Sequence, residues 1–290
     1  MANLRKIHKR IKGVESTRQI TKSMKMVAAS KLRRTQGAFA AQRAFAERCE
    51  GLLAEVCADA GELEHPLLRP REEPRRVCYV LLLGNRGLCG GYNHELLRYA
   101  REQIEAEDRE ASLLLCGRWG KDILPGMGLP PAESFPISDS PDAGEARALA
   151  EHLREMYLRG ETDEIQLLYQ HYRSVLQQEP CRKQLLPLPL ERGDRAGESR
   201  WLFEPDRDSL LDKLLRLYLD NLLHSVLLEA RTGEHSARMT AMSAAADNTE
   251  ELIGKLRLEL NHARQAAITT EISEIAGGAA ALQQSRDEGL

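Results

Sequence analysis

No proline follows Pro205 in this 290-residue chain, and apolar or small residues recur beyond it at alternating steps of three and four. This spacing predicts one continuous helix of about 75 residues, roughly 110 Å long at 1.5 Å per residue. Compact domains do not enclose a helix of that length, so the pattern favours a coiled coil. The expected seam consists of Met239, Met242, Ala246, Thr249, Ile253, Leu256, Leu260, Ala263 and Ala267, followed by Ile268, Ile272, Ile275, Ala279 and Leu282 after a small phase shift.

The N-terminal end carries a second seam of the same kind, and no proline occurs before Pro66. We expect a helix of about 55 residues, roughly 80 Å long. A long helix needs a packed face for stability, so the two terminal helices are predicted to pack against each other in antiparallel fashion. The expected seam consists of Leu4, Ile7, Ile11, Val14, Thr17, Thr21, Met24 and Ala28, and it continues through Leu32, Ala40, Phe45, Leu52 and Val56.

The middle of the chain has a different pattern. Apolar runs at 77–83, 112–117 and 164–172 alternate with helical patterns at 93–108 and 142–160. This alternation predicts βαβ units and a small, mainly parallel sheet. The predicted fold class is therefore α/β plus a long antiparallel coiled coil, with domains at 1–60, 74–195 and 205–285.

Composition restricts the function further. The net charge of −3 argues against a wholly basic nucleic-acid binder, and an aromatic content of 4% argues against a thick globular core. Six scattered cysteines without metal-site spacing indicate a reducing, cytosolic compartment. The sequence contains no apolar run long enough to span a membrane and no secretory signal.

The first 34 residues contain many lysines and arginines but only one acid, Glu15. A transit peptide, a helix that binds nucleic acid or an anionic membrane, and a solvated helix face all share this composition. A cleavable presequence is not expected to carry one uninterrupted seam into the rest of the chain.

A glycine-rich turn, RGLCGG, follows the first apolar run. Gly84, Gly87, Gly90 and Gly91 do not match the dinucleotide spacing, and no Gly-Lys-Ser/Thr closes the loop. These glycines favour a tight turn with close strand–helix packing over a nucleotide site. Arg86 could still meet an anion.

Catalytic patterns are weak. His224, His235 and His262 stand on the long C-terminal helix without further metal ligands nearby, which favours surface or packing roles. Glu271 and Glu274 lie one turn apart, as on any charged helix face. We therefore predict no catalytic residue, no cofactor and no metal.

The C-terminal helix is rich in small residues, as in SAAAD, ARQAAITT and IAGGAAAL. Small side chains permit close approach, or allow a rod to turn inside a collar. Helix propensity alone does not account for Gly277 and Gly278, because glycine costs about 1 kcal/mol relative to alanine inside a helix.

The chain contains TRQITKSMKMVAASKLRR near its start, RGLCGGYN in the middle, and ARMTAMSAAADNTEELI followed by ARQAAITTEISEIAGGAAAL at its end. In this order and at these places, the stretches resemble the gamma subunit of the bacterial F-type ATP synthase over essentially the whole chain. The resemblance implies a non-catalytic central-stalk rotor shaft with a Rossmann-like middle domain. Its coiled coil would enter a ring of alpha and beta subunits, and rotation would couple ion flow to ATP synthesis or hydrolysis. ATP would bind in the ring and not at RGLCGG.

The resemblance also implies partners and location. They are the alpha, beta and epsilon subunits and the c-ring, with one copy of this chain per complex and no nucleic acid. The chain would lie peripherally at the cytoplasmic face of the bacterial inner membrane. The family usually has an acidic residue where this chain has Asn85, and QQSRDEGL extends beyond the point where many relatives stop.

The family's contact residues can be placed by position. Contacts between the shaft and the ring are expected at Lys22, Met24, Lys25, Met26, Arg238, Arg264, Gln265, Thr269, Glu271 and Glu274. Docking on the c-ring and the epsilon subunit is expected at Trp201, Phe203 and Glu204. A basic face that slides past carboxylates would give attraction without fixed geometry.

Two other classes of protein remain as alternatives. One is a nucleotide-dependent enzyme built on the middle domain, against which the missing phosphate motif counts. The other is a basic coiled-coil protein that binds DNA or an anionic membrane, which leaves the small-residue C-terminal end unexplained.

Overall fold

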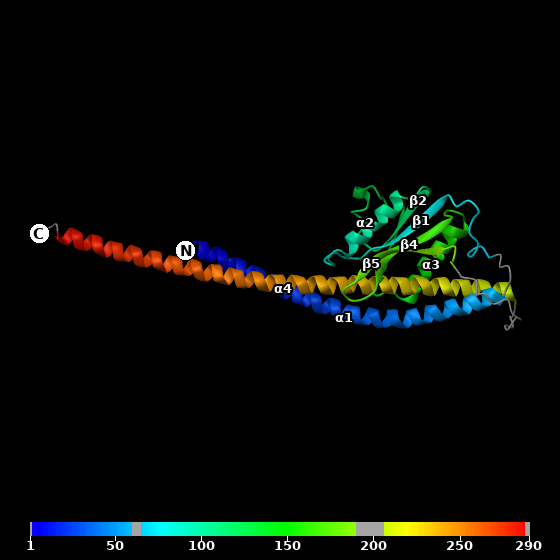
Figure 1. Ribbon diagram of the computed structural model, residues 1–290, viewed down its shortest axis with the longest axis horizontal. Coiled ribbons are helices and arrows are strands. Elements are labelled where there is room, and N and C mark those ends of the chain that lie inside the picture. The colour runs from blue at the N-terminus through cyan, green and yellow to red at the C-terminus, as the bar shows by residue number, and fades with distance from the viewer. Residues whose placement is uncertain (1, 60–64, 190–205, 288–290) are drawn as a thin grey trace. The chain divides into compact units, whose positions relative to one another are not determined.

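The computed structural model describes residues 2–59, 65–189 and 206–287. One long helix of 58 residues precedes an α/β segment along the chain and another of 81 residues follows it, which confirms the predicted fold class. The elements labelled in Figure 1 are α1 (Ala2–Asp59), β1 (Arg76–Leu82), α2 (Tyr92–Glu105), β2 (Glu110–Cys116), β3 (Glu133–Phe135), α3 (Ala143–Leu158), β4 (Glu164–Tyr172), β5 (Gln178–Leu186) and α4 (Arg207–Asp287).

Contacts between residues divide the chain into two compact units. One consists of the first 26 residues together with those from Met242 onward, and the other of residues 27–241. The larger unit contains the sheet and the adjoining parts of both long helices. The division into three domains made from the sequence remains a prediction.

The sheet of the larger unit has the strand order β3-β2-β1-β4-β5. β1 pairs in parallel with β2 and with β4, β2 pairs in parallel with β3, and β5 pairs antiparallel with β4. β3 and β5, which the apolar pattern did not predict, form the two edges. An edge position also explains how β5 accommodates Pro180, because an edge strand can lack one backbone donor.

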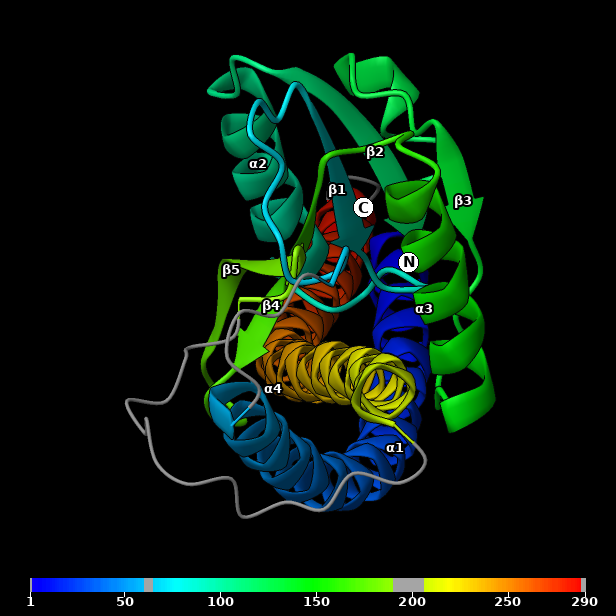
Figure 2. The same cartoon turned by 90° about the vertical axis from the view of Figure 1, so that its right-hand side faces the viewer.

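Alternate residues of the strands enter two apolar cores, as the pleat requires. Tyr79 and Leu81 of β1 pack with α2, whereas Val80 and Leu82 pack in the core that contains residues of α3 and α4. Figure 2 shows α2 and α3 on opposite sides of the strands. α3 begins at a capping box in which Asp142 and Glu145 satisfy each other's backbone N–H groups.

Within the larger unit, α4 lies between α1 and the sheet (Figures 1 and 2). Its residues 225–236 are all buried, so this stretch is enclosed on every side. A polar contact joins the two helices, since Gln42 Nε2 donates to Asn221 Oδ1 at 2.8 Å.

In this unit the predicted seam of α1 is buried at Ala28, Leu32 and Val56 but is wrong at Ala40, Phe45 and Leu52. Phe45 and Leu52 are 48% and 40% exposed, whereas Phe39 and Leu53 are 8% and 1% exposed. Ala40 is also exposed. The buried positions keep a strict seven-residue repeat, and polar residues such as the buried Thr35 occupy part of it. A search for apolar residues alone therefore selects positions outside the buried face of α1.

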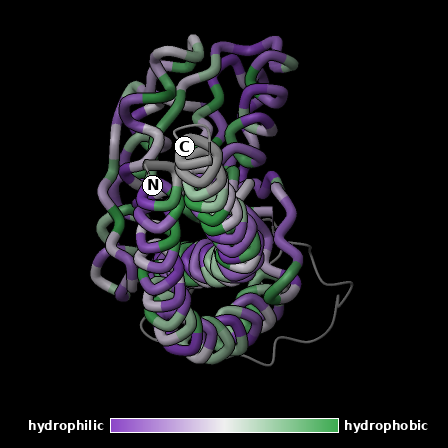
Figure 3. The backbone as a smooth tube through the Cα atoms, turned by 90° about the vertical axis from the view of Figure 1, so that its left-hand side faces the viewer, coloured by the Kyte–Doolittle hydropathy of each residue, from purple (hydrophilic) through white to green (hydrophobic). Residues whose placement is uncertain are grey.

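In the smaller unit, α1 and α4 run antiparallel. Lys25 Nζ donates to Ser243 Oγ at 2.9 Å, Arg18 pairs with Glu250 at 3.3 Å, and Glu15 pairs with Arg257 at 3.0 Å. The α4 seam is buried at Met242, Ala246, Ile253 and Leu256, and on the α1 side at Ile11 and Thr21. Thr17 is exposed, and Arg18 takes the less exposed position beside it. Figure 3 shows hydrophilic and hydrophobic residues alternating along both helices.

The predicted continuation of the α4 seam is also wrong. Ile268, Ile272 and Ile275 are 48%, 61% and 73% exposed, and Ala279 is exposed as well. The reason is that α1 begins at Ala2, and its first turns already lie beside residues 256–263. The side chain of Leu282 lies outside the described part of the chain. No described helix is both long and apolar enough to cross a membrane.

Candidate functional site: a polar clasp and two helix faces

The glycine-rich turn lies at the carboxyl end of β1, where open α/β sheets usually bind ligands. β1 stands between β2 and β4, so the strand order reverses at this point and a crevice opens there in related architectures. Gly117, which follows β2, has φ +110, and a Cβ there would lie 2.2 Å from the Leu83 carbonyl oxygen. A glycine is therefore required for the two strand ends to meet.

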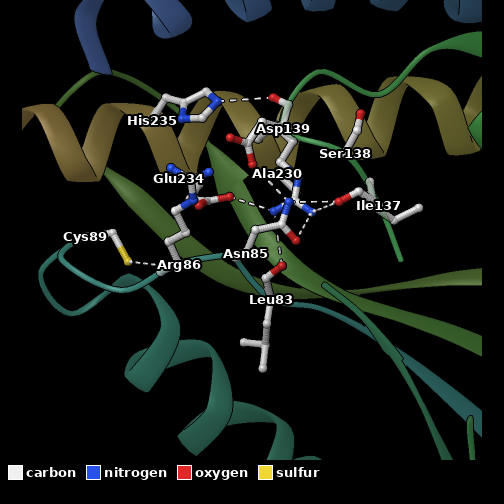
Figure 4. A network of polar contacts seen from close by, with 12 residues as sticks. Leu83, Asn85, Arg86, Cys89, Ile137, Ser138, Asp139, Ala230, Glu234 and His235 are labelled. Carbon is white, nitrogen blue, oxygen red and sulfur yellow. Dashed lines mark hydrogen bonds and ion pairs between the residues drawn. The ribbon is translucent and has the colours of Figure 1, made fainter. Parts of the chain in front are cut away.

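Helix α4 occupies this crevice with Arg231. Figure 4 shows the surroundings, with Leu83, Asn85, Ile137 and Glu234 labelled. Its Nη1 donates to the Leu83 carbonyl at 3.3 Å, and its Nη2 donates to Asn85 Oδ1 at 3.3 Å and to the Ile137 carbonyl at 3.2 Å. The residue is 4% exposed. One guanidinium group thus joins α4 to the end of β1, the glycine turn and the loop before α3.

Glu234 lies between two arginines of its own helix. Its Oε2 accepts from Arg231 and its Oε1 from Arg238, each at 2.6 Å, and its side chain is 2% exposed. Burial raises the pKa of this carboxyl, but the positive charges of Arg231 and Arg238 outweigh burial and hold the pKa below its ordinary value. The carboxylate therefore remains charged inside the protein.

Arg238 extends the contacts to the glycine turn, where its Nη2 donates to the Arg86 carbonyl at 3.1 Å. Beneath it, the Gly84 N–H donates to Asn93 Oδ1 at 2.9 Å. A Cβ on Gly84 would lie 3.0 Å from Glu234 Cδ, so this glycine permits close approach of the helix.

A second arm reaches helix α1. Asn85 Nδ2 donates to the Ile137 carbonyl at 2.8 Å and to Asp139 Oδ1 at 3.0 Å, and Lys31 Nζ donates to Asp139 Oδ2 at 2.5 Å. Burial raises the pKa of Asp139, but the hydrogen bonds from Asn85 and Lys31 hold it well below its ordinary value. The amide of Asn85 donates to Asp139, whereas a carboxylate at position 85 would repel it.

We call Lys31, Asn85, Asp139, Arg231, Glu234 and Arg238 the polar clasp. His235 adjoins it, with Nε2 at 3.2 Å from the Asp139 carbonyl oxygen and Nδ1 at 3.3 Å from Arg238 Nη1. Burial lowers the pKa of His235, which favours a neutral ring that donates from Nε2 and accepts at Nδ1. These groups satisfy one another, and such an arrangement fixes chain segments in place.

The N-terminal contact residues expected from the family lie together on α1 in the smaller unit. Met24 is half-buried and lines a shallow hollow of about 350 Å³ with Ser16, Gln19, Ile20 and Ser23. Lys25 is exposed and Met26 is 66% exposed. Lys22 Nζ lies 3.7 Å from Glu250 Oε2, and both side chains are more than half exposed.

The C-terminal set lies further along α4, with Arg264 roughly 30 Å along the helix axis from Ser243, the contact of Lys25. Arg264, Gln265, Thr269, Glu271 and Glu274 are all exposed. Arg238 lies nearer the glycine turn and pairs with Glu234; its expected contact with the ring remains a prediction. Trp201, Phe203 and Glu204 lie outside the described residues.

Sequence reasoning missed Arg231, Glu234, Asp139 and Lys31. Lys31 meets Asp139 and Arg231 meets Ile137 across more than 90 residues of sequence, which no local spacing indicates. The spacing of Glu234 from Arg231 and Arg238 is local, but charged helix faces show the same spacing. Among the described residues no group of three or more His, Cys, Asp or Glu side chains could hold a metal ion.

Comparisons with known proteins cover nearly the whole chain. A family model described as ATP synthase matches residues 3–282. The ATP synthase gamma chain of Heliobacterium modesticaldum is 42% identical over 97% of this chain and 100% of its own length, and that of Desulfitobacterium hafniense is 43% identical over 98% and 100%.

Solved structures share the fold. A chain from the Euglena gracilis mitochondrial ATP synthase, in a structure of OSCP/F1/c-ring in rotational state 3, gives a TM-score of 0.70. The match covers 98% of this chain and 96% of that chain, at 18% sequence identity.

Proposed function

The chain belongs to the ATP synthase gamma chain family, and from this premise we propose how its described surfaces work. Membership confirms the family indicated by the sequence motifs. The chain functions as the central-stalk rotor shaft, which couples ion flow through the membrane sector to ATP synthesis or hydrolysis at the catalytic subunits by rotation.

The observation that carries the mechanism is the unpartnered apolar face of α4. Ile268, Ile272 and Ile275 are largely exposed beyond the reach of α1. An exposed apolar stripe of this kind indicates an interaction surface. We assign it, with Arg264, Gln265, Thr269, Glu271 and Glu274, to the collar formed by the alpha and beta subunits.

The second contact surface is the face of α1 around Met24. Lys22 and Lys25 give it positive charge, and among the described residues each makes one exposed contact to α4. Cations of this kind can follow the acidic loops of successive beta subunits, because attraction between exposed charges needs no fixed geometry. Met24 adds a neutral, flexible side chain at the centre of this face.

The shaft then acts as an asymmetric cam. Each orientation presents a different part of its surface to each catalytic subunit and stabilises a different conformation there. Rotation shifts these populations only through differences in contact free energy.

The chain itself is non-catalytic in this proposal. Its carboxyl-edge crevice is filled by Arg231 and Glu234 of its own helix, which supports a scaffold role for the glycine turn. Nucleotide chemistry belongs to the surrounding subunits. Arg238 acts by coupling the turn to the shaft.

The proposed assembly contains one copy of this chain with the alpha, beta and epsilon subunits and the c-ring. Trp201, Phe203 and Glu204 belong to the foot that docks on the c-ring and epsilon. The three proposed domains are the N-terminal helix at 1–60, the α/β domain at 74–195 and the C-terminal helix at 205–285. The complex lies at the cytoplasmic face of the bacterial inner membrane, with this chain bound peripherally.

The test is reconstitution with alpha and beta subunits and observation of a bead on the middle domain. Cys89 is only 2% exposed, so the bead is attached through Lys121→Cys at an exposed loop position. Stepwise rotation in one direction after ATP addition supports the shaft. A complex that hydrolyses ATP while the bead stays still identifies a static clamp and refutes the proposal. A complex without the introduced cysteine controls for nonspecific bead attachment.

A further inference from the structure

Torque has to pass between α4 and the sheet if the proposed function is right, and this inference rests on that function. We propose that the polar clasp is the element that carries this torque within the larger unit. Arg231 and Glu234 are its central positioning residues, and Asn85 and Asp139 are the points at which the middle domain receives the load.

Apolar packing restrains the rotational setting of α4 from one side, where Val226, Leu227 and Ala230 enter the apolar core. Residues 225–236 are buried on all sides of the helix, so the polar side needs contacts of its own. Hydrophobic burial is non-directional. A tangential load therefore needs contacts that depend on angle.

The clasp supplies such contacts. Arg231, Glu234 and Arg238 are spaced three and four residues apart and share one helix face. Arg231 binds three acceptors from two separate segments, 83–85 and the loop at Ile137, and its planar fork allows little change in direction. A turn of the helix by one residue, about 100°, would remove all of these contacts together.

Other contacts also reach this part of α4 from the middle domain. The carboxylate of Glu229 accepts from the Tyr172 N–H at 3.0 Å and lies 2.6 Å from His171 Nδ1, whereas two further hydrogen bonds join neutral groups. Ser236 Oγ donates to the Val175 carbonyl at 2.6 Å, and Tyr92 Oη donates to the Ala230 carbonyl at 2.7 Å. Charge-assisted hydrogen bonds are roughly twice as strong as neutral ones. The angular restraint therefore falls mainly on the charged groups, and of these the clasp makes more contacts with the middle domain than Glu229 does.

Stability alone does not explain why Arg231, Glu234 and Arg238 are buried together. Replacing a buried ionic triad by well-packed apolar residues is often neutral or stabilising, because desolvation offsets the attraction between the charges. A buried Arg–Glu–Arg arrangement is better explained by a requirement for one fixed orientation.

The arm from Asn85 through Asp139 to Lys31 extends this restraint to α1. The Asn85 amide donates to Asp139 and accepts from Arg231, so both parts of the clasp meet in one side chain. Within the larger unit, both long helices are thereby held to the same end of the sheet.

The test compares Arg231→Met with Arg109→Met in the reconstituted complex. Arg109 is a matched control, because it pairs with Glu107 at 2.7 Å and Glu164 at 2.5 Å just before β2, at the amino end of the strands. The probe is a bead on Lys121→Cys, and the measurement is its angular variance in complexes halted by removing ATP. Variance is inversely related to torsional stiffness, so losing one of the two arginines of the triad should raise it about twofold, while Arg109→Met stays at the wild-type value.

Equal variance in Arg231→Met and Arg109→Met overturns the inference. If Arg231→Met does not assemble, Arg231→Lys provides the same comparison, because it keeps the charge and loses the fork. Failure of the proposed function looks different, since the wild-type bead then does not rotate with ATP at all. That result removes the load and overturns this inference as well.

Discussion

Replacing Gly84 by alanine should destabilise the middle domain at the crevice beside β1. The new methyl group would lie 3.0 Å from Glu234 Cδ and 3.1 Å from Asn93 Oδ1. Neither neighbour is free to move away, because two arginines hold Glu234 and the Gly84 N–H itself donates to Asn93. Overpacking of this kind costs about 1–3 kcal/mol.

Gly126→Ala is the matched control. A Cβ at Gly126 meets nothing within 4 Å, so the substitution adds no contact. Both variants reduce the freedom of the unfolded chain in the same way, which by itself stabilises by about 0.4–1 kcal/mol. The difference between the two variants therefore isolates the steric cost.

Hydrogen exchange of the β1 amides in the full-length chain measures this difference. A free-energy difference of about 1.4 kcal/mol changes the exchange rate tenfold, so the β1 amides should exchange about 5- to 150-fold faster in Gly84→Ala than in Gly126→Ala. Equal exchange rates would show that Glu234 yields to the methyl group. The description of the clasp as a fixed, close-packed contact would then be wrong.

Three further results are expected. Met24→Lys should reduce the coupling between ATP hydrolysis and ion pumping in vesicles, because a lysine there can pin one orientation against an acidic loop; full coupling would contradict the cam. Phe39→Ala should lower the free energy of unfolding, measured in urea, by about 3 kcal/mol. Phe45→Ala should lower it by no more than about 0.5 kcal/mol. Equal losses would mean that both side chains lie on the same buried face. Hydrogen bonding to Arg109, despite burial, lowers the pKa of Glu107 to about 2, so its contribution is present above about pH 4.3 and is lost as the pH falls toward 2. In Glu107→Gln the free energy of unfolding should therefore change less with pH between about 4.3 and 2 than in the wild type. An unchanged slope would show that Glu107 does not contribute.

The long helices were predictable because their residues obey a simple period. On α4, every predicted seam position from Met239 to Ala267 is buried or half-buried. On α1, the prediction fails after Leu32, where Thr35 and Gln42 occupy seam positions as polar residues. Hydrophobicity alone favours Phe45, although the seven-residue repeat leads to Phe39 and Ala46.

The middle domain shows a different limit. Buried strands such as β1 and β4 are apolar throughout and were predicted, whereas β5 carries Arg182 and Lys183 because one of its sides has no neighbouring strand. The clasp could not be predicted at all. Arg231 meets Leu83 and Ile137 only because the fold brings the three segments together, and no spacing along the chain encodes that meeting.

The filled crevice also determines when the fold can be completed. During synthesis, all five strands emerge before the first residue of α4. Until the ribosome has released Arg231 and Glu234, the end of β1 lacks its cover and one core of the sheet lacks Leu215, Leu223 and Leu227. The α/β domain therefore cannot reach its native state before this part of α4 is available, although its strands are synthesised earlier, and nascent chains that end before Arg231 should depend on chaperones.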